Sequence, residues 1–431
     1  MSKEENRKNF SKYVSQNILG MIGFSCYVLA DSYFISIAKG ADGLTALNLV
    51  MPLYSIIFSI GEMIGVGSAI RYAISKIKKD ADADDYFWNA IIWCIMSSMI
   101  FVFAGIFFSS DIMRVLGADE HIVAVGNNYT KIFMCFAPMF MCNYVTNAFV
   151  RNDGAPGIAM SATLFSSLFN IVFDYILMFP MNLGMEGAAL ATALSPIIGM
   201  GICSIHFFSK KSSVRLVVCK PSVRKLVAGS QLGVSAFVGE MSSAVITLAF
   251  NFVILKLTGN VGVAAYGVVA NIAIVTTAVF NGVAQGSQPL ISSCFGRGDK
   301  DGCTQLKRMG YTTAFVLAAV MYSILFIFAE QFVAVFNSEG SEMLRLYATE
   351  GVKLYFIGIF FAGINIVGGG AFSATEDAFK AAVVSVTRGF VLILGAVFVM
   401  SALFGMTGVW LAYAVAEGIT TFIMLVMALR V

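Results

Sequence analysis

The sequence predicts an all-α polytopic membrane protein with twelve transmembrane helices, arranged as two six-helix repeats. Composition is the first observation behind this prediction: 58% of the residues are hydrophobic, only 12% are charged, and the mean hydropathy is +0.83. A soluble domain carries roughly 25% charged residues. The second observation is that apolar runs recur along the whole chain, and the third is an internal duplication.

Six apolar runs fill the first half of the chain, and each has the roughly 20 residues that a membrane-spanning helix needs. The first run follows a polar tail and lacks a small-residue cleavage site, which predicts a retained helix and not a signal peptide. Pro52, Pro138 and Pro196 fall inside runs and predict kinks, because neighbouring helices satisfy the freed carbonyls. The runs are 13–38, 44–70, 86–108, 122–149, 157–179 and 186–208.

Six further runs fill the second half. Pro289 predicts a kink in the eighth helix, and Glu330 marks the outer end of the ninth. The runs are 226–255, 262–291, 310–330, 352–372, 380–404 and 407–429.

Lysine and arginine are unevenly distributed between the connections, and such residues concentrate on the cytoplasmic side. The chain ends and every second connection hold 21 of the 28, with Arg151 counted among these loop charges. Both termini are therefore predicted to be cytoplasmic. Lys131, Lys353 and Arg388 lie within runs near their ends, where snorkelling to the interface explains them. The opposite connections hold only Lys39, Arg114, Lys256 and Arg345.

An internal duplication organises the chain. The segment 184–194 (GMEGAALATAL) matches 405–415 (GMTGVWLAYAV) at 6 of 11 positions with an offset of 221, and 61–70 aligns with 282–291 at the same offset. Six helices per half is an even number, so both halves enter from the same side and are related by a pseudo-two-fold axis along the membrane normal. This predicts a central cavity and alternating access. The expected divisions are an N-terminal lobe at 1–210, a cytoplasmic basic linker at 211–225 and a C-terminal lobe at 226–431.

Charge and cysteine usage exclude several classes of protein. The net charge of +3 follows from the asymmetry between connections and does not indicate nucleic-acid binding. The eight cysteines are scattered without a CxxC pair, and Cys219 and Cys303 fall in loops expected to be cytoplasmic, which argues against disulfides and a zinc site. His121 and His206 are too few for a histidine metal centre.

Two carboxylates, Asp31 and Asp174, lie in the middle of apolar runs. A central charge costs roughly 2.5–3.5 kcal/mol there, so such acids commonly serve an ion or substrate pathway. Asn170 precedes Asp174 by one helical turn and shares its face. With Asp31 and Thr192 they offer carboxylate, amide and hydroxyl oxygens, which suit a hard cation or a proton relay. The alternative is that both acids only hydrogen-bond a neighbouring helix.

Other intramembrane polar residues are candidates for a substrate cavity. Glu240 lies in the seventh run with no acidic counterpart in the first half, and a cavity-facing carboxylate there would meet a cationic substrate. For Glu62 and Glu417, solvation at a helix end or a partner such as Arg388 explains the charge equally well. The remaining cavity candidates are Asn251 and Asn365.

Six strings occur in order along nearly the whole chain: LADSYFIS (29–36), FVRNDGAPGIAM (149–160), NIVFDYILMF (170–179), GMEGAALAT (184–192), VAAYGVVANIA (263–273) and GVAQGSQPLIS (282–292). They resemble the multidrug and toxic compound extrusion (MATE) transporters, in particular the bacterial DinF-like branch. The resemblance implies that Asp31, Asn170, Asp174 and Thr192 form a cation site in the N-terminal lobe.

The chain also departs from the family pattern. Family members often carry a proline early in helices one and seven, where this chain has Ser15-Gln16 and Gly233-Val234. A proline-driven bend of the first helix is therefore not implied. The tenth-helix aspartate of the NorM branch is missing, and the polar residue nearby is Asn365, which argues against coupling through the C-terminal lobe.

The resemblance and the acids together predict a secondary-active multidrug efflux antiporter, not an enzyme. It would export amphipathic, cationic organic compounds in exchange for H+ or Na+ by alternating access. We expect no cofactor, small-molecule substrates and membrane lipid as the partners, no nucleic acid, and a monomer in the bacterial cytoplasmic membrane.

Two alternatives stay open at this point. A lipid-linked oligosaccharide flippase of the same superfamily would line its cavity with cationic residues, whereas the central charges here are acidic. A membrane-embedded transferase would need an aspartate-rich motif at the membrane surface or a catalytic histidine. The only acidic run, at 80–85 (DADADD), lies in a short loop.

Overall fold

The computed structural model describes residues 3–336 and 341–429, which are helical apart from short connections. Within them, nine helical segments are long and apolar enough to cross a membrane, or ten when the bent pair α3 (Glu120–Cys135) and α4 (Ala137–Asn152) is taken as one span. Two of these segments, Val223–Gly296 and Ala378–Ala428, contain a glycine with non-helical angles and comprise two spans each. The twelve predicted helices are thus confirmed for the described residues.

The first half contains α1 to α6. Helix α1 (Lys3–Lys78) holds the first two spans and is broken at Gly40 (φ 58°, ψ −141°). Pro138 lies at the start of α4, where its missing N–H ends the helical ladder, and α3 and α4 meet at a bend of 46°. The kink predicted for Pro138 is therefore a full break. The other elements are α2 (Asp85–Val115), α5 (Pro156–Met178) and α6 (Gly184–Phe207).

The second half contains α7 to α13. Helix α7 (Val223–Gly296) is broken at Gly259 (φ 66°, ψ −156°), and α13 (Leu392–Leu429) at Gly405 (φ 58°, ψ −135°). Glu330 lies in the first turn of α9, just after α8 ends, and its place on the outer side stays a prediction. The other elements are α8 (Lys300–Ile327), α9 (Ala329–Phe336), α10 (Glu342–Tyr355), the 3-10 turn η1 (Phe356–Gly358), α11 (Ile359–Ala374), α12 (Ala378–Val386) and the π-helical turn η2 (Thr387–Val391).

The internal repeat is visible in the backbone. Gly184 and Gly405, which head the two matching segments, both adopt positive φ, at 52° and 58°. Gly40 and Gly259 break α1 and α7 at corresponding places with φ of 58° and 66°. Positive φ places a Cβ too close to the following carbonyl, so glycine is the residue that tolerates these turns. The same tight connection is thus used in both halves.

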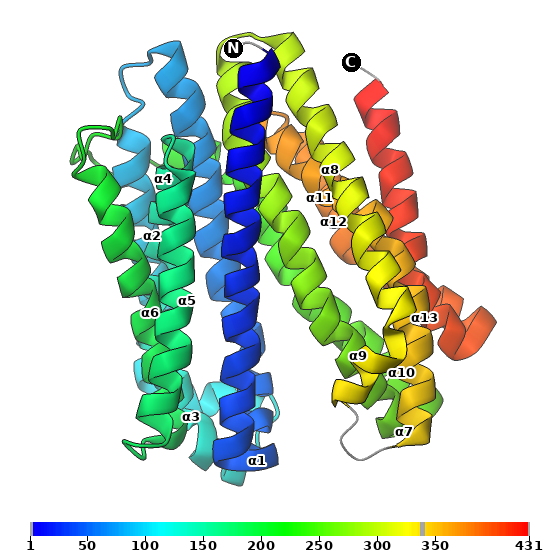
Figure 1. Cartoon of the computed structure of the whole chain (residues 1–431). Coiled ribbons are helices and arrows are strands. Elements are labelled where there is room, and N and C mark those ends of the chain that lie inside the picture. The colour runs from blue at the N-terminus through cyan, green and yellow to red at the C-terminus, as the bar shows by residue number, and fades with distance from the viewer. Residues whose placement is uncertain (1–2, 337–340, 430–431) are drawn as a thin grey trace.

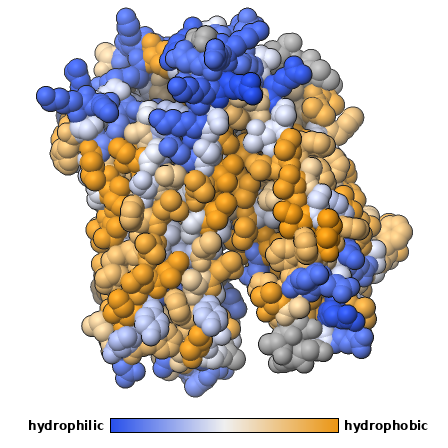
Figure 2. All heavy atoms as spheres, viewed as in Figure 1, coloured by the Kyte–Doolittle hydropathy of each residue, from blue (hydrophilic) through white to orange (hydrophobic). Residues whose placement is uncertain are grey.

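The two halves form separate helical bundles that meet at one end of the molecule. In Figure 1, α1 to α6 lie on the left and α7 to α13 on the right, with both termini at the top, and the bundles diverge toward the bottom. Figure 2 shows the surface hollowed between them at that lower end, and an apolar band around the middle with polar residues at both ends. Large apolar side chains are exposed on α2, among them Ile100 (71%) and Phe107 (64%). The chain is an integral membrane protein.

Backbones of the two halves touch at the end that carries the termini. A Cβ added to Gly67 of α1 would fall on the carbonyl oxygen of Gly229 of α7, and one on Gly233 would fall on that of Met63. Arg71 reinforces this contact, because it pairs with Glu376 and its Nε donates to the Ala228 carbonyl at 3.1 Å. The molecule is therefore closed at this end.

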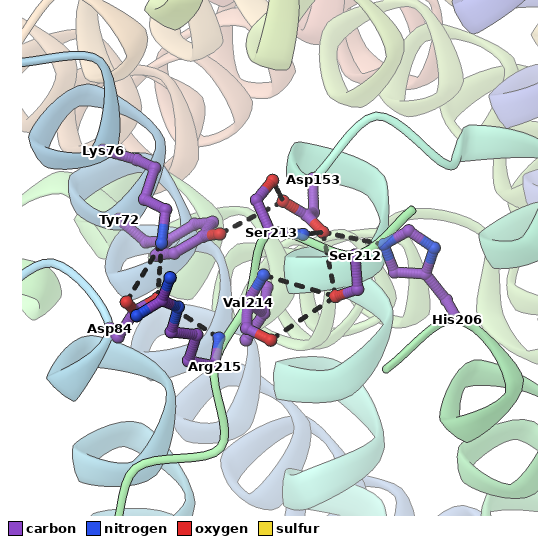
Figure 3. A network of polar contacts seen from close by, with 9 residues as sticks. All are labelled: Tyr72, Lys76, Asp84, Asp153, His206, Ser212, Ser213, Val214 and Arg215. Carbon is purple, nitrogen blue, oxygen red and sulfur yellow. Dashed lines mark hydrogen bonds and ion pairs between the residues drawn. The ribbon is translucent and has the colours of Figure 1, made fainter. Parts of the chain in front are cut away.

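The segment between α6 and α7, residues 208–222, lies along the first half as a strap (Figure 3). Asp153 is its main anchor: the carboxylate accepts hydrogen bonds from His206 Nε2 at 2.8 Å, Tyr72 at 3.1 Å and the Ser213 backbone N–H at 2.9 Å. Further along, the backbone N–H of Arg215 donates to Asp84 at 3.2 Å and that of Ser222 donates to Asn89 at 2.7 Å. The strap is thus fixed to the first half up to the start of α7.

Candidate cation site and central cavity

The four residues predicted to hold a cation come from three helices of the first half and are all buried. Asp31 lies in the first span of α1 with 6% exposure, Asn170 and Asp174 in α5 with 0%, and Thr192 in α6 with 1%. The Asn170 amide lies 3.1 Å from the Thr192 hydroxyl. With its nitrogen turned toward Asp174, the amide donates to Oδ2 at 3.1 Å while its oxygen accepts from the Thr192 backbone and hydroxyl. Asn170 therefore joins Asp174 to Thr192.

Asp31 and Asp174 are left with unsatisfied oxygens. The Oδ1 atoms of both side chains are buried and have no hydrogen-bond partner within residues 3–336 and 341–429. The two carboxylates also interact with each other electrostatically, and both interact in this way with the hydroxyl of Tyr27. Two buried acids without a basic partner are costly when both are ionised. A proton or a metal cation would relieve that cost.

A polar cavity lies beside this site and between the halves. It has two contiguous chambers of about 110 Å³ and 80 Å³, which share Glu62, Glu240 and Gln285 as lining residues. No hydrogen bond or ion pair reaches the Glu240 carboxylate from the described part of the chain. Glu240 thus presents a free carboxylate to the cavity. Asn251 lies half-buried on α7 and lines neither chamber.

Glu62 belongs to a polar chain that the sequence did not predict. Its Oε1 accepts from Gln285 Nε2 at 3.1 Å, and Gln285 Oε1 in turn accepts from Arg151 Nη1 at 2.6 Å. Arg151 was placed among the loop charges, but only 4% of it is exposed, at the end of α4. The reason is that α4 carries it inward against Asn17 and Gln285 instead of outward. The motif FVRNDGAP was the only signal that could have marked it.

In the second half, Asn365 and Glu417 form a buried cluster with the guanidinium of Arg388. Arg388 Nε donates to Glu417 Oε1 at 2.6 Å, and Asn365 Nδ2 donates to Oε2 at 2.7 Å. The partner suggested for Glu417 is confirmed. Asn365 and Arg388 both line the second chamber, so Arg388 does not snorkel to the interface as expected. The reason is that Glu417, which is 2% exposed, holds it inside.

The family model MatE matches residues 17–176 and again residues 236–399, which together make up most of the chain. The chain belongs to the MatE family. The two matches cover corresponding parts of the two halves. This MatE chain is accordingly a membrane transporter and not an enzyme.

Curated relatives cover nearly all of this MatE chain. The multidrug export protein MepA of Staphylococcus aureus is 27% identical over 414 residues, which are 93% of this chain and 89% of MepA. The protein of the same name from Staphylococcus saprophyticus is 26% identical over 410 residues with the same coverage.

Solved structures share the fold of this MatE chain. One is the outward-facing conformation of a multidrug resistance MATE family transporter of the MOP superfamily, with a TM-score of 0.92 and 20% identity over 99% of this chain and 96% of that chain. Another is a MOP superfamily transporter from Pyrococcus furiosus, described as having a binding pocket of reverse polarity. It has a TM-score of 0.91 and 19% identity over 99% of this chain and 95% of that chain.

Proposed function

We propose that this protein exports amphipathic, cationic organic compounds from the cell in exchange for H+ or Na+, by alternating access. One observation carries the proposal: two buried carboxylates, Asp31 and Asp174, have free oxygens and no basic partner in the described chain, beside a cavity that contains the free carboxylate of Glu240. The multidrug export function named for the MepA relatives supports it.

Coupling would use the cost of holding two acids together. Binding of H+ or Na+ between Asp31 and Asp174 removes that cost, and loss of the ion restores it. If one state of the transporter opens this site outward and the other opens it inward, the ion gradient biases the equilibrium between the two states. A cationic substrate on Glu240 would travel in the opposite direction.

The energy available from the membrane potential depends on the net charge that each exchange moves. One charge moving through about 150 mV supplies roughly 3.5 kcal/mol, since 100 mV is worth about 2.3 kcal/mol per charge. Because about 1.4 kcal/mol corresponds to a factor of ten, that energy sustains a concentration ratio of a few hundred. Exchange of one monovalent cation for one H+ or Na+ moves no net charge and draws on the concentration gradient of the coupling ion alone, whereas exchange for two ions also gains this energy.

The proposed orientation has both termini in the cytoplasm of a bacterium. The distribution of lysine and arginine supports it, because the end that carries the termini also carries the basic strap. In that orientation the closed end of the molecule is cytoplasmic and the hollow between the halves faces outward. The likeness to an outward-facing transporter fits this assignment. We propose a monomer, with lipid around the apolar band.

The test is transport by the purified protein in proteoliposomes under separately imposed proton and sodium gradients. Asp31→Asn and Asp174→Asn should each abolish gradient-driven export, because asparagine is nearly isosteric but cannot change charge. Both variants should remain folded in the membrane. Export at the wild-type rate by both variants, under either gradient, would show that the N-terminal site does not couple transport.

The lipid-linked oligosaccharide flippase remains a second candidate, and one observation favours it. Arg151 and Arg388 bring two guanidiniums to the cavity. The sequence had led us to expect only acidic charges there. Both guanidiniums already donate to neighbouring side chains, however, and Glu240 does not have such a neighbour within the described chain. Movement of a diphosphate-linked lipid in the same proteoliposomes, without an ion gradient, would decide for the flippase.

A further inference from the structure

The strap and the first turn of α7 carry only positive charge. Residues 208–224 contain five lysines or arginines and no aspartate or glutamate, and all five basic side chains are exposed. Clusters of about four to eight basic residues next to the cytoplasmic end of a span are typical of segments that bind acidic lipid headgroups. The five residues are Lys210, Lys211, Arg215, Lys220 and Arg224.

Neighbouring acids do not neutralise these five charges. Asp84 pairs with Lys76 at 2.7 Å, and Asp85 pairs with Lys225. The strap receives from Asp84 only a hydrogen bond to the backbone N–H of Arg215, at 3.2 Å. In the described part of the chain, no ion pair reaches any of the five exposed basic side chains. Their charge is therefore available to a partner outside the protein.

Exposed apolar side chains lie directly beside the charges. Leu216, Val217 and Val218 are consecutive and all exposed. Phe208 and Val223 are exposed at the two ends of the strap, by 81% and 60%. A contiguous apolar surface rimmed by polar residues is typical of a membrane or protein contact. Interfacial segments place such side chains at the boundary of the acyl chains and keep their lysines and arginines among the headgroups.

The strap lies where it can meet a lipid leaflet. It begins at the outer edge of the first half, on the side away from the second half, and the polar surface at that edge borders the apolar band (Figures 1 and 2). Ile205, in the last turn of α6, is 64% exposed there. Asp153, Asp84 and Asn89 hold the strap backbone in place. A partner would therefore bind a surface that is already ordered.

We propose that the strap and the first turn of α7 form a binding surface for anionic phospholipids. The lysines and arginines would contact the phosphate and the net negative charge of the headgroup, because guanidinium and ammonium groups form charge-assisted hydrogen bonds with phosphate oxygens. Leu216, Val217 and Val218 would contact the start of the acyl chains. Such binding requires neither export activity nor a particular direction of export, so it can fail or succeed independently of the proposed function.

The experiment measures lipid contact at the strap itself. A cysteine that replaces Val218 in a cysteine-free, full-length background is labelled with bimane, and the protein is placed in lipid nanodiscs. Brominated phosphatidylglycerol or brominated phosphatidylcholine is then titrated in, because bromine quenches the fluorophore on contact and so reports the relative affinity of each lipid. The charge variant is Lys210→Gln/Lys211→Gln/Lys220→Gln.

A matched control removes three exposed basic residues from the second half, at the end that carries the termini. It is Arg297→Gln/Lys300→Gln/Arg308→Gln, with the same label. A further variant, Leu216→Ser/Val217→Ser, keeps every charge and removes part of the apolar surface. All the substituted side chains are exposed, so the variants should fold as the wild type does.

Wild type and the matched control should prefer phosphatidylglycerol over phosphatidylcholine about tenfold. The charge variant should lose most of this preference, because each basic residue near an anionic surface contributes about fivefold. Leu216→Ser/Val217→Ser should reduce quenching by both lipids. Equal quenching by the two lipids in the wild type, or an unchanged preference in the charge variant, would overturn the proposal. An absence of quenching by either lipid would also overturn it and assign the strap to a soluble anionic partner.

Discussion

At the scale of single residues, the two neutral side chains of the proposed cation site would distinguish the two possible coupling ions. Asn170 and Thr192 contribute an amide and a hydroxyl beside Asp174. A bound sodium ion needs several oxygen ligands, whereas a carboxylate that exchanges a proton can do so with fewer neighbours. The contribution of Asn170 and Thr192 to ion binding can therefore be tested separately from that of the two aspartates.

Asn170→Ala and Thr192→Ala should sharply reduce sodium-driven export and leave proton-driven export largely intact, if sodium occupies this site. The reason is that each change removes one neutral oxygen and keeps both carboxylates. Asn170 offers its oxygen when its nitrogen donates to the Thr192 hydroxyl at 3.1 Å. Rates in proteoliposomes under each gradient provide the measurement. Equal reductions under both gradients would indicate that Asn170 and Thr192 only hold Asp174 in position.

Gln285 is the second informative residue, because its amide connects two charged groups of the opposite half. It accepts from Arg151 and donates to Glu62. Gln285→Leu should destabilise the closed end by about 1.5–3 kcal/mol, the worth of a hydrogen bond to a charged group. Thermal unfolding in detergent measures this, with the exposed Gln331→Leu as control. An unchanged transition temperature in Gln285→Leu would mean that Arg151 and Glu62 pair directly once the amide is gone.

At the scale of helices and connections, the strap is the element with the clearest energetic role. Asp153 and His206 are each 3% exposed at their side chains and pair at 2.8 Å. Removing the Asp153 carboxylate leaves its buried hydrogen-bond donors without an acceptor, which costs about 1–3 kcal/mol for each. The strap residues that bind Asp153 would lose their anchor at the same time.

Asp153→Ala should therefore release the strap and speed cleavage by trypsin at Arg215, which is exposed and held to the first half through its backbone. Membrane vesicles that expose the cytoplasmic side allow the cleavage to be followed over time. Asp301→Ala, an exposed change in the first turn of α8, should cleave at the wild-type rate. Resistance of Asp153→Ala to trypsin would assign the anchoring to Asp84 and Asn89 instead.

The helices themselves were largely predictable, because a span needs about 20 apolar residues and the sequence shows them directly. Gly40 and Gly259 fall in the gaps between predicted runs, yet the chain turns there within one residue. Asp31 and Asp174 were visible in the sequence as charges inside apolar runs, and the structure buries both. Their role in a cation site stays a prediction. Arg151 and Gln285 were missed because their bond joins residues 134 positions apart, which no local pattern reports.

At the scale of the whole molecule, sidedness is the property that everything else depends on. The strap and the opposite connection before α6 should lie on different sides of the membrane. Single cysteines at Val218 (77% exposed) and Met181 (57% exposed) in a cysteine-free background test this with a membrane-impermeant thiol reagent on intact cells. Only the cysteine at Met181 should react. Equal labelling of both would refute the twelve-helix orientation with cytoplasmic termini.

Contacts between the halves should also set the balance between the two states. Arg71 of α1 pairs with Glu376, which lies between α11 and α12, and Lys78 lies 3.6 Å from the same carboxylate. Glu376→Gln should weaken the closed end and raise the labelling, from the cytoplasmic side, of a cysteine that replaces Ser68, which lies against Gly229 and is 1% exposed. The reversed pair Arg71→Glu/Glu376→Arg should restore protection. If the reversed pair labels as fast as Glu376→Gln, the charges do not hold the halves together.

The strap also determines where the two bundles can pivot relative to each other. It is pinned to the first half as far as the Ser222 backbone, and α7 begins at the next residue. The tether between the two bundles therefore has no slack, and a rocking motion has to be absorbed in the opening turn of α7. The distance between a spin label on the strap and one on α2 should stay constant through the transport cycle. The distance between labels on α2 and α8 should change as the bundles move. The two bundles are therefore joined by a short hinge and not by a flexible linker.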